Sequence, residues 1–465
     1  MKFGAAATSD VQRLRDLVRV VREATGREEQ IVVVCTAPAR VTDALIRAAR
    51  AAAKGEGLAA DEARRELWTR HRALAERLVS DDWEREVLYK EWAEMLKKFD
   101  RITRAIGVLG EHSARSIDTV AALGEQFITN LVAVALREAK VPAKIIPAPE
   151  IFLTDDHFGN ARPLMDETVA RAKAKLGPLL AARIVPVVAG YTGATSDGAM
   201  TTLGRGGGDY SATIIGAAIG ADVVTFWTDT DGILTADPKI VPEARTLPEL
   251  SFIEAAEVAT LGAEVLHQRT LAPLAAAGIP LRLRNVTNTE NPGTLVLTTP
   301  SPSERSARAI ISARGLSLLS ATASARSSID QSWTPEFTTA ALERLTDSGI
   351  EILTFSQSFS ERSLTLTVRA SDATFARDEL AAILAASGAT AGHTITMVTP
   401  VAMIAVIAAH NTDSLTPLTF AAIGRAGAHV LTLACDPNAL HIAFTLPEAE
   451  LDDVVRALHR DLRLA

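Results

Sequence analysis

The chain has 465 residues, more than one hydrophobic core usually holds, so we expect two or three domains. Its composition, with 48% hydrophobic, 22% charged and 5% aromatic residues, is typical of a globular protein. The formal net charge of -8 and the isoelectric point near 5.7 argue against a nucleic-acid-binding surface, which is normally basic.

Up to about residue 300, short β-branched runs alternate with longer helical patterns. The runs are IVVVC (31–35), AKIIPA (143–148), RIVPVVAG (183–190), DVVTFW (222–227) and IPLRLRN (279–285). Continuous apolar runs predict strands that are covered on both faces. Their alternation with helices therefore predicts an α/β domain with a parallel or mostly parallel sheet.

The stretch at 54–113 interrupts this alternation. It is rich in strong helix formers and in opposite charges three or four residues apart, which predicts a helical hairpin added to the sheet. Its tryptophans, Trp68, Trp83 and Trp92, are expected to pack against the domain rather than to bind a cofactor.

A segment dense in Ser, Thr and Pro at 298–309 predicts a linker. After it, the order strand–helix–strand–strand–helix occurs twice. This weak duplication predicts two ferredoxin-like units, at 305–395 and 396–465, which follow a first domain at 1–300.

Cysteine usage and apolar stretches bear on the compartment. Cys35 and Cys435 lie in apolar runs without metal-ligand spacing, so we expect two buried, reduced thiols. No apolar stretch is expected to reach the roughly 20 residues that cross a bilayer, and the start, MKFGAAATSDVQRLRD, lacks the apolar core of a signal peptide. The expectation is a cytoplasmic protein without a membrane partner.

Two segments carry candidate chemistry. TTLGRGGGDYSA (201–212) predicts exposed backbone N–H groups where a helix begins, which is an anion site unless the segment is only a flexible loop. WTDTDGILTADPKIV (227–241) places Asp229, Asp231 and Asp237 near the carboxyl end of a strand, where open α/β sheets bind ligands. Turn formation alone would also explain these acids, and the later ligands of a calcium loop are missing.

Six collinear segments together resemble aspartate kinase, a member of the amino-acid-kinase family. They are KFGAAAT (2–8), CTAPARVT (35–42), ALGEQF (122–127), GRGGGD (204–209), the 227–241 segment and LSFIEAAEVATLGAEVLH (250–267). Further on, FSQSFSERSLTLTV (355–368) is similar to the regulatory modules of that family, known as ACT domains. The resemblance implies an amino-acid-kinase fold, a mostly parallel sheet between helices, followed by two α+β ACT domains.

The resemblance also implies an activity, the transfer of the γ-phosphoryl group of ATP to the side-chain carboxylate of L-aspartate. The product, 4-phospho-L-aspartate, leads to lysine, threonine and methionine. Lys2 would stabilise the transferring group and Asp209 would orient Lys2. Arg205 would pair with the α-carboxylate of aspartate, Glu125 would meet its ammonium, and Thr42 would supply a hydroxyl.

By the same resemblance, the nucleotide would be held by residues from several motifs. These are Gly4, Thr36, Gly206, Gly207, Thr228, Asp229 and Lys239. The implied Mg²⁺ would bridge the phosphates of ATP with few protein ligands, so no dedicated protein metal site is expected.

Several positions depart from the family pattern on the ligand-facing motifs. Ala5, Ala6 and Ala7 stand where the family has Gly-Thr-Ser, and Glu264 stands where a lysine is common. Gly208 replaces a usual serine and Leu234 a usual tyrosine. An alternative function is therefore a catalytically weak or inactive paralogue that binds amino acids, and a third is a kinase of another acidic substrate.

The regulatory half is expected to bind an amino-acid effector, lysine or threonine. Ser356, Gln357 and Ser358 would contact it, facing the segment QSWTPEF (331–337), which enters a helix at Pro335. The family resemblance implies a homo-oligomer, a dimer through the ACT domains. Dimerisation without any effector is the alternative role of these two units.

Overall fold

The computed structural model describes residues 1–261, 266–301, 306–323, 335–358, 363–386, 393–409, 415–435 and 440–464. The chain divides into two compact units. The first consists of Met1–Ile233, Pro248–Phe252 and Leu266–Pro300, and the second of Leu234–Leu247, Ile253–Val265 and Ser301–Ala465. Each unit has its own central sheet.

The first unit is built on an eight-stranded sheet in the order β3-β4-β2-β1-β7-β9-β10-β8. Its strands are β1 (Lys2–Phe3), β2 (Val33–Cys35), β3 (Ala143–Ile146), β4 (Val185–Ala189), β7 (Val224–Thr228), β8 (Glu249–Ser251), β9 (Leu281–Asn285) and β10 (Thr294–Leu297). Neighbouring strands are parallel except β9 and β10, so the predicted mostly parallel sheet is confirmed. A hairpin of β5 (Thr192–Ala194) and β6 (Met200–Thr202) stands apart from this sheet.

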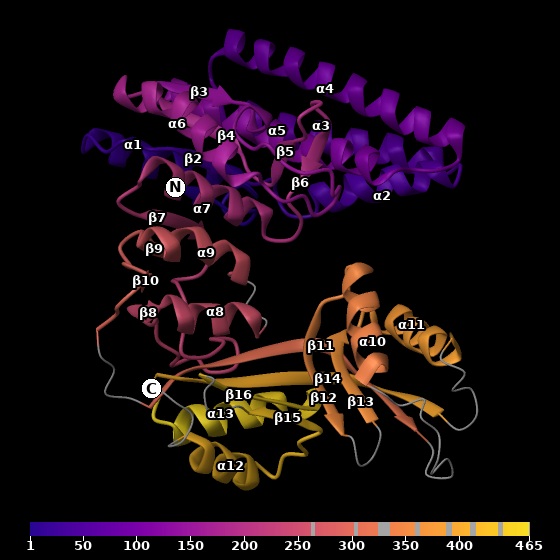
Figure 1. The fold of residues 1–465 in the computed structure, drawn as a ribbon. Helices are drawn as coiled ribbons and strands as arrows, with labels where there is room; N and C mark the ends of the chain where they lie inside the picture. The colour runs from indigo at the N-terminus through magenta and orange to yellow at the C-terminus, as the bar shows by residue number, and fades with distance from the viewer. Residues whose placement is uncertain are drawn as a thin grey trace. The chain divides into compact units, whose positions relative to one another are not determined.

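Two groups of helices pack on this sheet (Figure 1). One group contains α1 (Val11–Gly26), α2 (Val41–Ala53) and α5 (Ala114–Glu138), and the other α6 (Met165–Ala181), α7 (Gly207–Ile219) and α9 (Gln268–Ala277). Helix α5 is long and apolar enough to cross a membrane by length and composition, which corrects the expectation that no segment would be. Of its most apolar window, 89% is buried, because this helix fills the core between the sheet and its neighbours.

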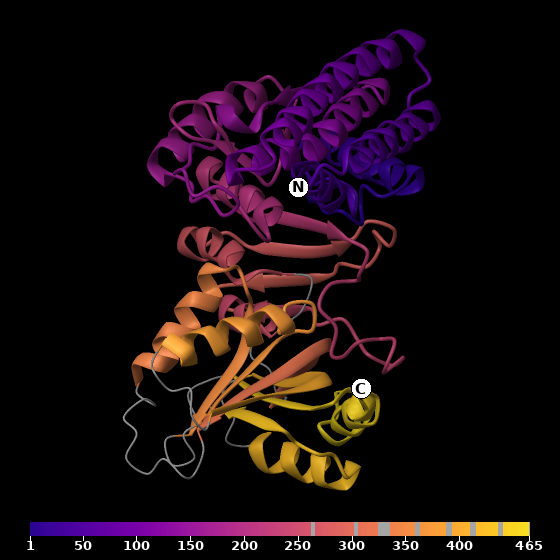
Figure 2. The ribbon, with the colours of Figure 1, turned by 90° about the vertical axis from the view of Figure 1, so that its right-hand side faces the viewer.

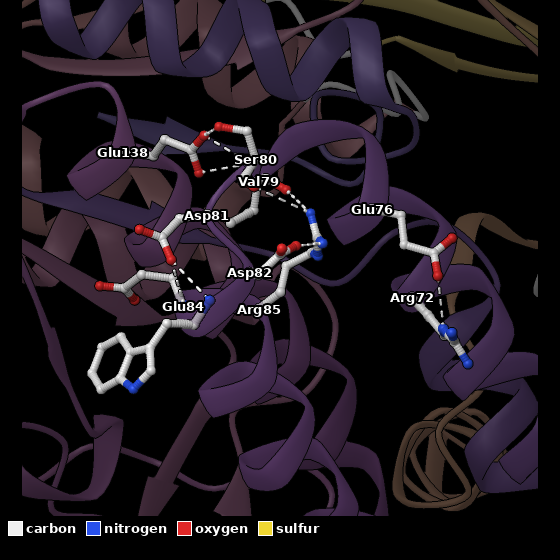
Figure 3. Close-up of polar contacts among 10 residues, drawn as sticks. Arg72, Glu76, Val79, Ser80, Asp81, Asp82, Glu84, Arg85 and Glu138 are labelled. Carbon is white, nitrogen blue, oxygen red and sulfur yellow. Dashed lines mark hydrogen bonds and ion pairs between the residues drawn. The ribbon is translucent and has the colours of Figure 1, made fainter.

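The interrupting stretch forms a hairpin of α3 (Gly57–Leu78) and α4 (Asp82–Leu109). Figure 3 shows its turn, where the Asp81 carboxylate accepts hydrogen bonds from two backbone N–H groups of the first turn of α4. The guanidinium of Arg85 donates to the Val79 carbonyl at 2.8 Å. Glu138, at the end of α5, accepts from the Ser80 N–H at 2.7 Å and so ties the turn to the domain.

The three tryptophans of this stretch have different environments. Trp92 is fully buried and stacks on Phe127 of α5, and Trp68 is half-buried against Tyr89. Trp83 is 70% exposed, so the expectation that it packs against the domain is wrong. It lies in the first turn of α4, on the solvent side.

The second unit contains a six-stranded sheet in the order β12-β13-β11-β14-β16-β15 (Figure 2). Its strands are β11 (Ala307–Ala323), β12 (Ile352–Ser358), β13 (Ser363–Arg369), β14 (His393–Ala408), β15 (Thr432–Cys435) and β16 (His441–Pro447). Its helices are α8 (Phe252–Thr260), which belongs to it from Ile253 on, α10 (Pro335–Asp347), α11 (Ala373–Ala386), α12 (Leu415–Ala426) and α13 (Leu451–Asp461). The twofold order strand–helix–strand–strand–helix runs from β11 to α11 and from β14 to α13.

The two long strands, β11 and β14, are shared between two hydrophobic cores. The early part of β11 contributes Ala307 and Ile310 to a core made with residues 402–464. Its late part contributes Leu319 and Ala321 to a core made with residues 337–384 and 395. We call the part around the core of residues 337–384 the first module, and the part around the core of residues 402–464 the second module. The two modules are not consecutive in the chain, because the early part of β11 completes the core of the second module.

The cysteines differ in burial, and both are free thiols. Cys35 is buried in β2, and burial raises the pKa of its thiol to about 12. Cys435 is exposed, which corrects the expectation of a buried thiol. It ends β15, an edge strand in which alternate residues face solvent.

Candidate active site

The central strand β1 and the start of α7 bring Lys2 and Asp209 together. Strand β1 lies between β2 and β7, and the Lys2 ammonium reaches Asp209 Oδ1 at 2.5 Å. Both side chains are less than a fifth exposed, at 13% and 18%. Because β1 is central and Asp209 is in the first turn of α7, the cation is held where an anion at the helix start would meet it.

The glycine-rich turn that starts α7 is shaped by close contacts. Gly206 has φ of 69°, and a Cβ added there would lie 2.8 Å from the Cβ of His267. A Cβ added at Gly208 would lie 2.6 Å from the Thr36 hydroxyl oxygen. The absent serine at 208 is thereby explained, since Thr36 occupies the space that a side chain would need. Gly207 is the first residue of α7.

The Thr36 hydroxyl has no hydrogen-bond partner among the described residues, although its oxygen is buried. A buried hydroxyl without a partner is costly unless a ligand or water completes it. It lies against the first turn of α7 and next to β1, whose Phe3 carbonyl accepts from the Thr36 N–H at 3.1 Å. This position suits a phosphate oxygen bound at the start of the helix.

Glu125 lies inside the domain on α5 and is 2% exposed. Burial raises the pKa of its carboxyl to about 8, opposed by hydrogen bonds from the Ala37 N–H and from Thr42. Its second oxygen is buried without a hydrogen-bond partner in the described part of the chain. The predicted pair Thr42 and Glu125 is therefore together, with one carboxylate oxygen left to accept from a ligand.

The predicted clamp residue Arg205 lies between two glycines in the left-handed region, Gly204 and Gly206, and its side chain is exposed. Gly4 donates its N–H to the Trp227 carbonyl at 3.2 Å, and a Cβ added to it would lie 3.0 Å from the Lys2 ammonium.

The alanine turn after Gly4 is free of backbone strain. The φ angle of Ala5 is not positive, so the methyl group there does not force the backbone into the left-handed region. Thr8 is fully buried and donates its hydroxyl to the Thr36 carbonyl at 2.9 Å, and Ser9 donates to the Ala6 carbonyl. Both hydroxyls thus donate to backbone carbonyls, that of Thr8 outside the turn and that of Ser9 within it.

The acidic segment after β7 is divided between the two units. Thr228 donates to Asp229 at 3.2 Å in the first unit, where Asp231 accepts from the amides of Asn285 and Asn288. Asp237 and Lys239 belong to the second unit. There the Asp237 carboxylate accepts from the Lys239 N–H, as in a turn, and the Lys239 side chain is exposed.

Two other predicted features fall partly outside the described residues. Glu264 lies outside them, as do residues 331–334 and 359–362 of the effector segments. Helix α10 begins at Pro335, as predicted. Ser356, Gln357 and Ser358 lie on β12, and Ser356 lines a small hydroxyl-rich hollow between β12–β13 and β15–β16. The Gln357 amide nitrogen is buried without a partner in the described sequence.

Sequence reasoning missed a buried polar group beside the site. Asp118 of α5 is 2% exposed and accepts three hydrogen bonds, from the Gly159 N–H and from the N–H and hydroxyl of Thr202. Burial raises the pKa of the Asp118 carboxyl, opposed by these bonds. Burial also raises the pKa of Tyr191 to about 12, with the carboxylates of Glu125 and Asp118 adding to it. Neither residue lies in a glycine-rich or acidic motif.

A family model described as the amino acid kinase family matches residues 1–285. The chain belongs to the amino acid kinase family. Aspartokinase 2, chloroplastic, from Arabidopsis thaliana is 32% identical over 329 residues, which cover 69% of this chain and 58% of that relative. The match thus spans little more than half the length of that amino acid kinase.

Two solved structures resemble this amino acid kinase over 99% of its length. Aspartokinase III of Escherichia coli, in complex with aspartate and ADP in the R-state, has a TM-score of 0.80 and 27% sequence identity over 99% of that chain. The same enzyme in complex with lysine and aspartate, in the T-state, has a TM-score of 0.77 and 26% identity over 98% of that chain. The resemblance to aspartokinases with a C-terminal regulatory region is therefore confirmed, and so is the predicted fold class.

Proposed function

We propose that this protein is an aspartate kinase, which transfers the γ-phosphoryl group of ATP to the side-chain carboxylate of L-aspartate. The observation that carries the proposal is the Lys2–Asp209 ion pair at the start of α7, with the unpartnered Thr36 hydroxyl beside that helix start. A cation and helix N–H groups directed at one place suit a transferring phosphoryl group, whose charge must be neutralised without covalent help.

Substrate selection would use charges of opposite sign. Arg205 would bind the α-carboxylate of aspartate in a two-pronged contact, and Glu125 would accept from its ammonium. The exposed guanidinium and the unpartnered oxygen of the buried carboxyl fit these roles. The aspartate in the complexes of the Escherichia coli aspartokinase supports this substrate.

Mg²⁺ would enter with ATP. The described residues contain no group of three or more His, Cys, Asp or Glu side chains placed to hold a metal ion. A helix start with few carboxylates suits an ion whose ligands are mainly phosphate oxygens and water. The ion would neutralise phosphate charge, while Lys2, Thr36 and the first turn of α7 would position the nucleotide.

The test is whether the purified protein releases ADP from MgATP only when aspartate is present, with the acyl phosphate trapped by hydroxylamine. Lys2→Ala should abolish ADP release, and Arg205→Ala should abolish aspartate binding in calorimetry. Unchanged aspartate affinity in Arg205→Ala would contradict the assignment of the clamp. A protein that binds aspartate and releases no ADP would favour the alternative, an inactive amino-acid-binding paralogue suggested by Ala5–Ala7.

The second unit would bind a regulatory amino acid. The unpartnered amide of Gln357 and the hydroxyls of Ser356 and Ser358 provide donors on one strand. The lysine in the T-state complex of the Escherichia coli enzyme supports lysine as the first effector to test, with threonine second. Millimolar lysine should raise the melting temperature by mass action, and Gln357→Ala, Ser358→Ala should lose that shift.

The wider setting is also part of the proposal. We place the reaction in the cytoplasm, as the first step toward lysine, threonine and methionine, in a homodimer joined through the regulatory modules. Size-exclusion chromatography with light scattering would test the dimer, and a monomer at micromolar concentration would contradict it.

A further inference from the structure

Helix α5 bears a second buried carboxylate seven residues before Glu125. Seven residues are close to two helical turns, so Asp118 and Glu125 lie on one face of the helix. Both are 2% exposed. Glu125 is used by the proposed function, whereas Asp118 has protein partners on both of its oxygens.

The contacts of Asp118 fix one end of the turn that carries Arg205. Its Oδ2 accepts from the Thr202 N–H at 2.9 Å and from the Gly159 N–H at 2.8 Å, and its Oδ1 accepts from the Thr202 hydroxyl at 2.8 Å. Thr202 ends β6, and Arg205 follows it by three residues. Helix α5 packs on β6.

The rest of the turn is held by backbone contacts and one arginine. The Thr202 carbonyl accepts from the Ala161 N–H at 2.9 Å, and the Leu203 N–H donates to the Tyr191 backbone carbonyl at 2.8 Å. The Leu203 carbonyl accepts from Arg269 at 2.6 Å. Asp118 is the only acidic group in this set, and its bonds are charge-assisted when it is ionised.

We propose that Asp118 is a positioning residue for substrate selection, which holds the Arg205 turn at a set distance from Glu125. One rigid helix would then carry the acceptor for the ammonium of an L-amino acid and the anchor of the clamp for its α-carboxylate. The inference rests on the proposed function, because it needs Arg205 and Glu125 to bind the same substrate. This arrangement would select the substrate by geometry, since a displaced Arg205 would weaken substrate binding even when every contacting side chain is present.

The closing experiment compares four variants of the full chain by calorimetry with aspartate and, separately, with MgADP. Asp118→Asn keeps the shape but cannot accept from all three donors, so the dissociation constant for aspartate should rise about tenfold or more. Thr202→Val removes one donor and should give a smaller rise, about threefold, which Thr202→Ser should reverse. None of these changes should alter the affinity for MgADP more than about twofold.

The matched control is Thr201→Val on the same strand. The Thr201 hydroxyl is buried and shares a 2.8 Å hydrogen bond with Thr154, so its loss weakens β6 without touching Asp118. Its melting temperature should fall while aspartate affinity stays unchanged. If Asp118→Asn fails to fold, the Thr202→Val and Thr202→Ser pair decides the question alone.

The outcomes separate this inference from the proposed function. Aspartate affinity unchanged in both Asp118→Asn and Thr202→Val overturns the positioning role and leaves the kinase proposal standing. An equal loss for aspartate and MgADP, shared by Thr201→Val, also overturns it, because general loosening of β6 would then explain the result. An unmodified protein that does not bind aspartate at all overturns both proposals.

Discussion

Among single residues, Glu125 combines full burial with a pKa raised to about 8, so most of the free protein at pH 7 carries this carboxyl protonated. A bound ammonium favours the ionised form. Aspartate binding at pH 7 should therefore release close to one proton, and aspartate affinity should rise with pH until about pH 8. Calorimetry in buffers of different ionisation enthalpy measures the proton release directly.

The control for this prediction is Glu125→Gln, which keeps the shape and cannot titrate. It should bind aspartate more weakly and show no pH dependence between pH 6 and 8. The effect of pH on the stability of the fold has the opposite sign. The Glu125 carboxyl contributes fully to the free energy of unfolding below its usual pKa, and this contribution is lost as pH rises through the folded-state pKa of about 8. Aspartate affinity that falls as pH rises from 6 to 8 would contradict the ammonium role of Glu125.

The alanine turn gives a second prediction at this scale. Changing Ala5→Gly, Ala6→Thr and Ala7→Ser restores the family's hydroxyls, and phosphoryl transfer should increase about tenfold or more if both bond charged groups. In the protein as it stands, the hydroxyls of Thr8 and Ser9 donate to backbone carbonyls. Initial rates of ADP release measure the gain, and an unchanged rate would show that the turn does not limit catalysis.

The candidate site residues that the sequence suggests lie in local motifs. Lys2, Glu125 and Arg205 belong to segments that resemble a family pattern, so they could be proposed in advance. Asp118 and Tyr191 contact residues that are distant in sequence, such as Thr202, and no local pattern marks such contacts. The contact between Thr36 and Gly208 likewise depends on how β2 meets α7 in space.

At the scale of elements, the α3–α4 hairpin contains a buried histidine that should make it sensitive to acid. His71 is fully buried against Trp92 and Phe127, and its Nδ1 lies 2.8 Å from the Leu67 carbonyl. Burial lowers the pKa of His71 to about 4. As pH falls, His71 of the unfolded chain therefore binds a proton near pH 6.5, whereas His71 of the folded chain binds it only near pH 4.

The sign and size follow from this difference. The contribution of His71 to stability is fully present above pH 6.5 and decreases as pH falls to 4, by about 3 kcal/mol in total. His71→Leu should remove this loss, so its free energy of unfolding should depend less on pH between 4 and 6.5. Urea denaturation at pH 7 and pH 5 measures the change.

The control Thr103→Val removes a buried hydroxyl that bonds the Phe99 carbonyl in the same hairpin. It carries no titrating group, so it should lower stability equally at both pH values. A His71→Leu variant that keeps the full acid sensitivity of the unmodified protein would assign that sensitivity to other groups.

Elements differed in how well the sequence predicted them. Buried apolar runs such as 31–35 and 183–190 predicted β2 and β4, because a strand covered on both faces has few polar residues. Strands β8 and β10 were missed, since three or four residues leave too little pattern to recognise. The long strands β11 and β14 were predicted as separate short strands of two units, because periodicity within a strand does not tell which core each half joins.

At the scale of the whole molecule, the boundary at residue 300 predicted from the linker does not separate the two compact units. Residues Leu234–Leu247 belong to the second unit, where Ala236, Ile240 and Val241 are buried in the core of the second module. The Ile240 carbonyl accepts from Arg456 at 3.2 Å, and the Thr235 hydroxyl lies 3.0 Å from His459 Nε2. A linker rich in Ser and Pro marks where the chain is irregular, whereas unit membership depends on long-range packing.

This arrangement predicts that residues 1–300 do not form an independently stable fold. Truncation after residue 300 would expose Ile240 and Val241, whose burial stabilises the fold by about 1.5–3 kcal/mol each. It would also remove Arg456, which donates to the Ile240 carbonyl. The truncated protein should therefore be less stable than the full chain, or aggregate, because apolar side chains of this segment lose their burial.

A full-length companion keeps this prediction testable if the truncated chain is insoluble. Ile240→Ala leaves the chain intact and removes a side chain that is 4% exposed, which should cost about 2–5 kcal/mol in the stability of the second unit. Leu380→Ala, in the core of the first module, is the matched control and should destabilise the second unit without touching segment 234–247. Urea denaturation of the unmodified protein, the two variants and the truncated chain measures these losses. An Ile240→Ala variant as stable as the unmodified protein would show that segment 234–247 does not depend on this core.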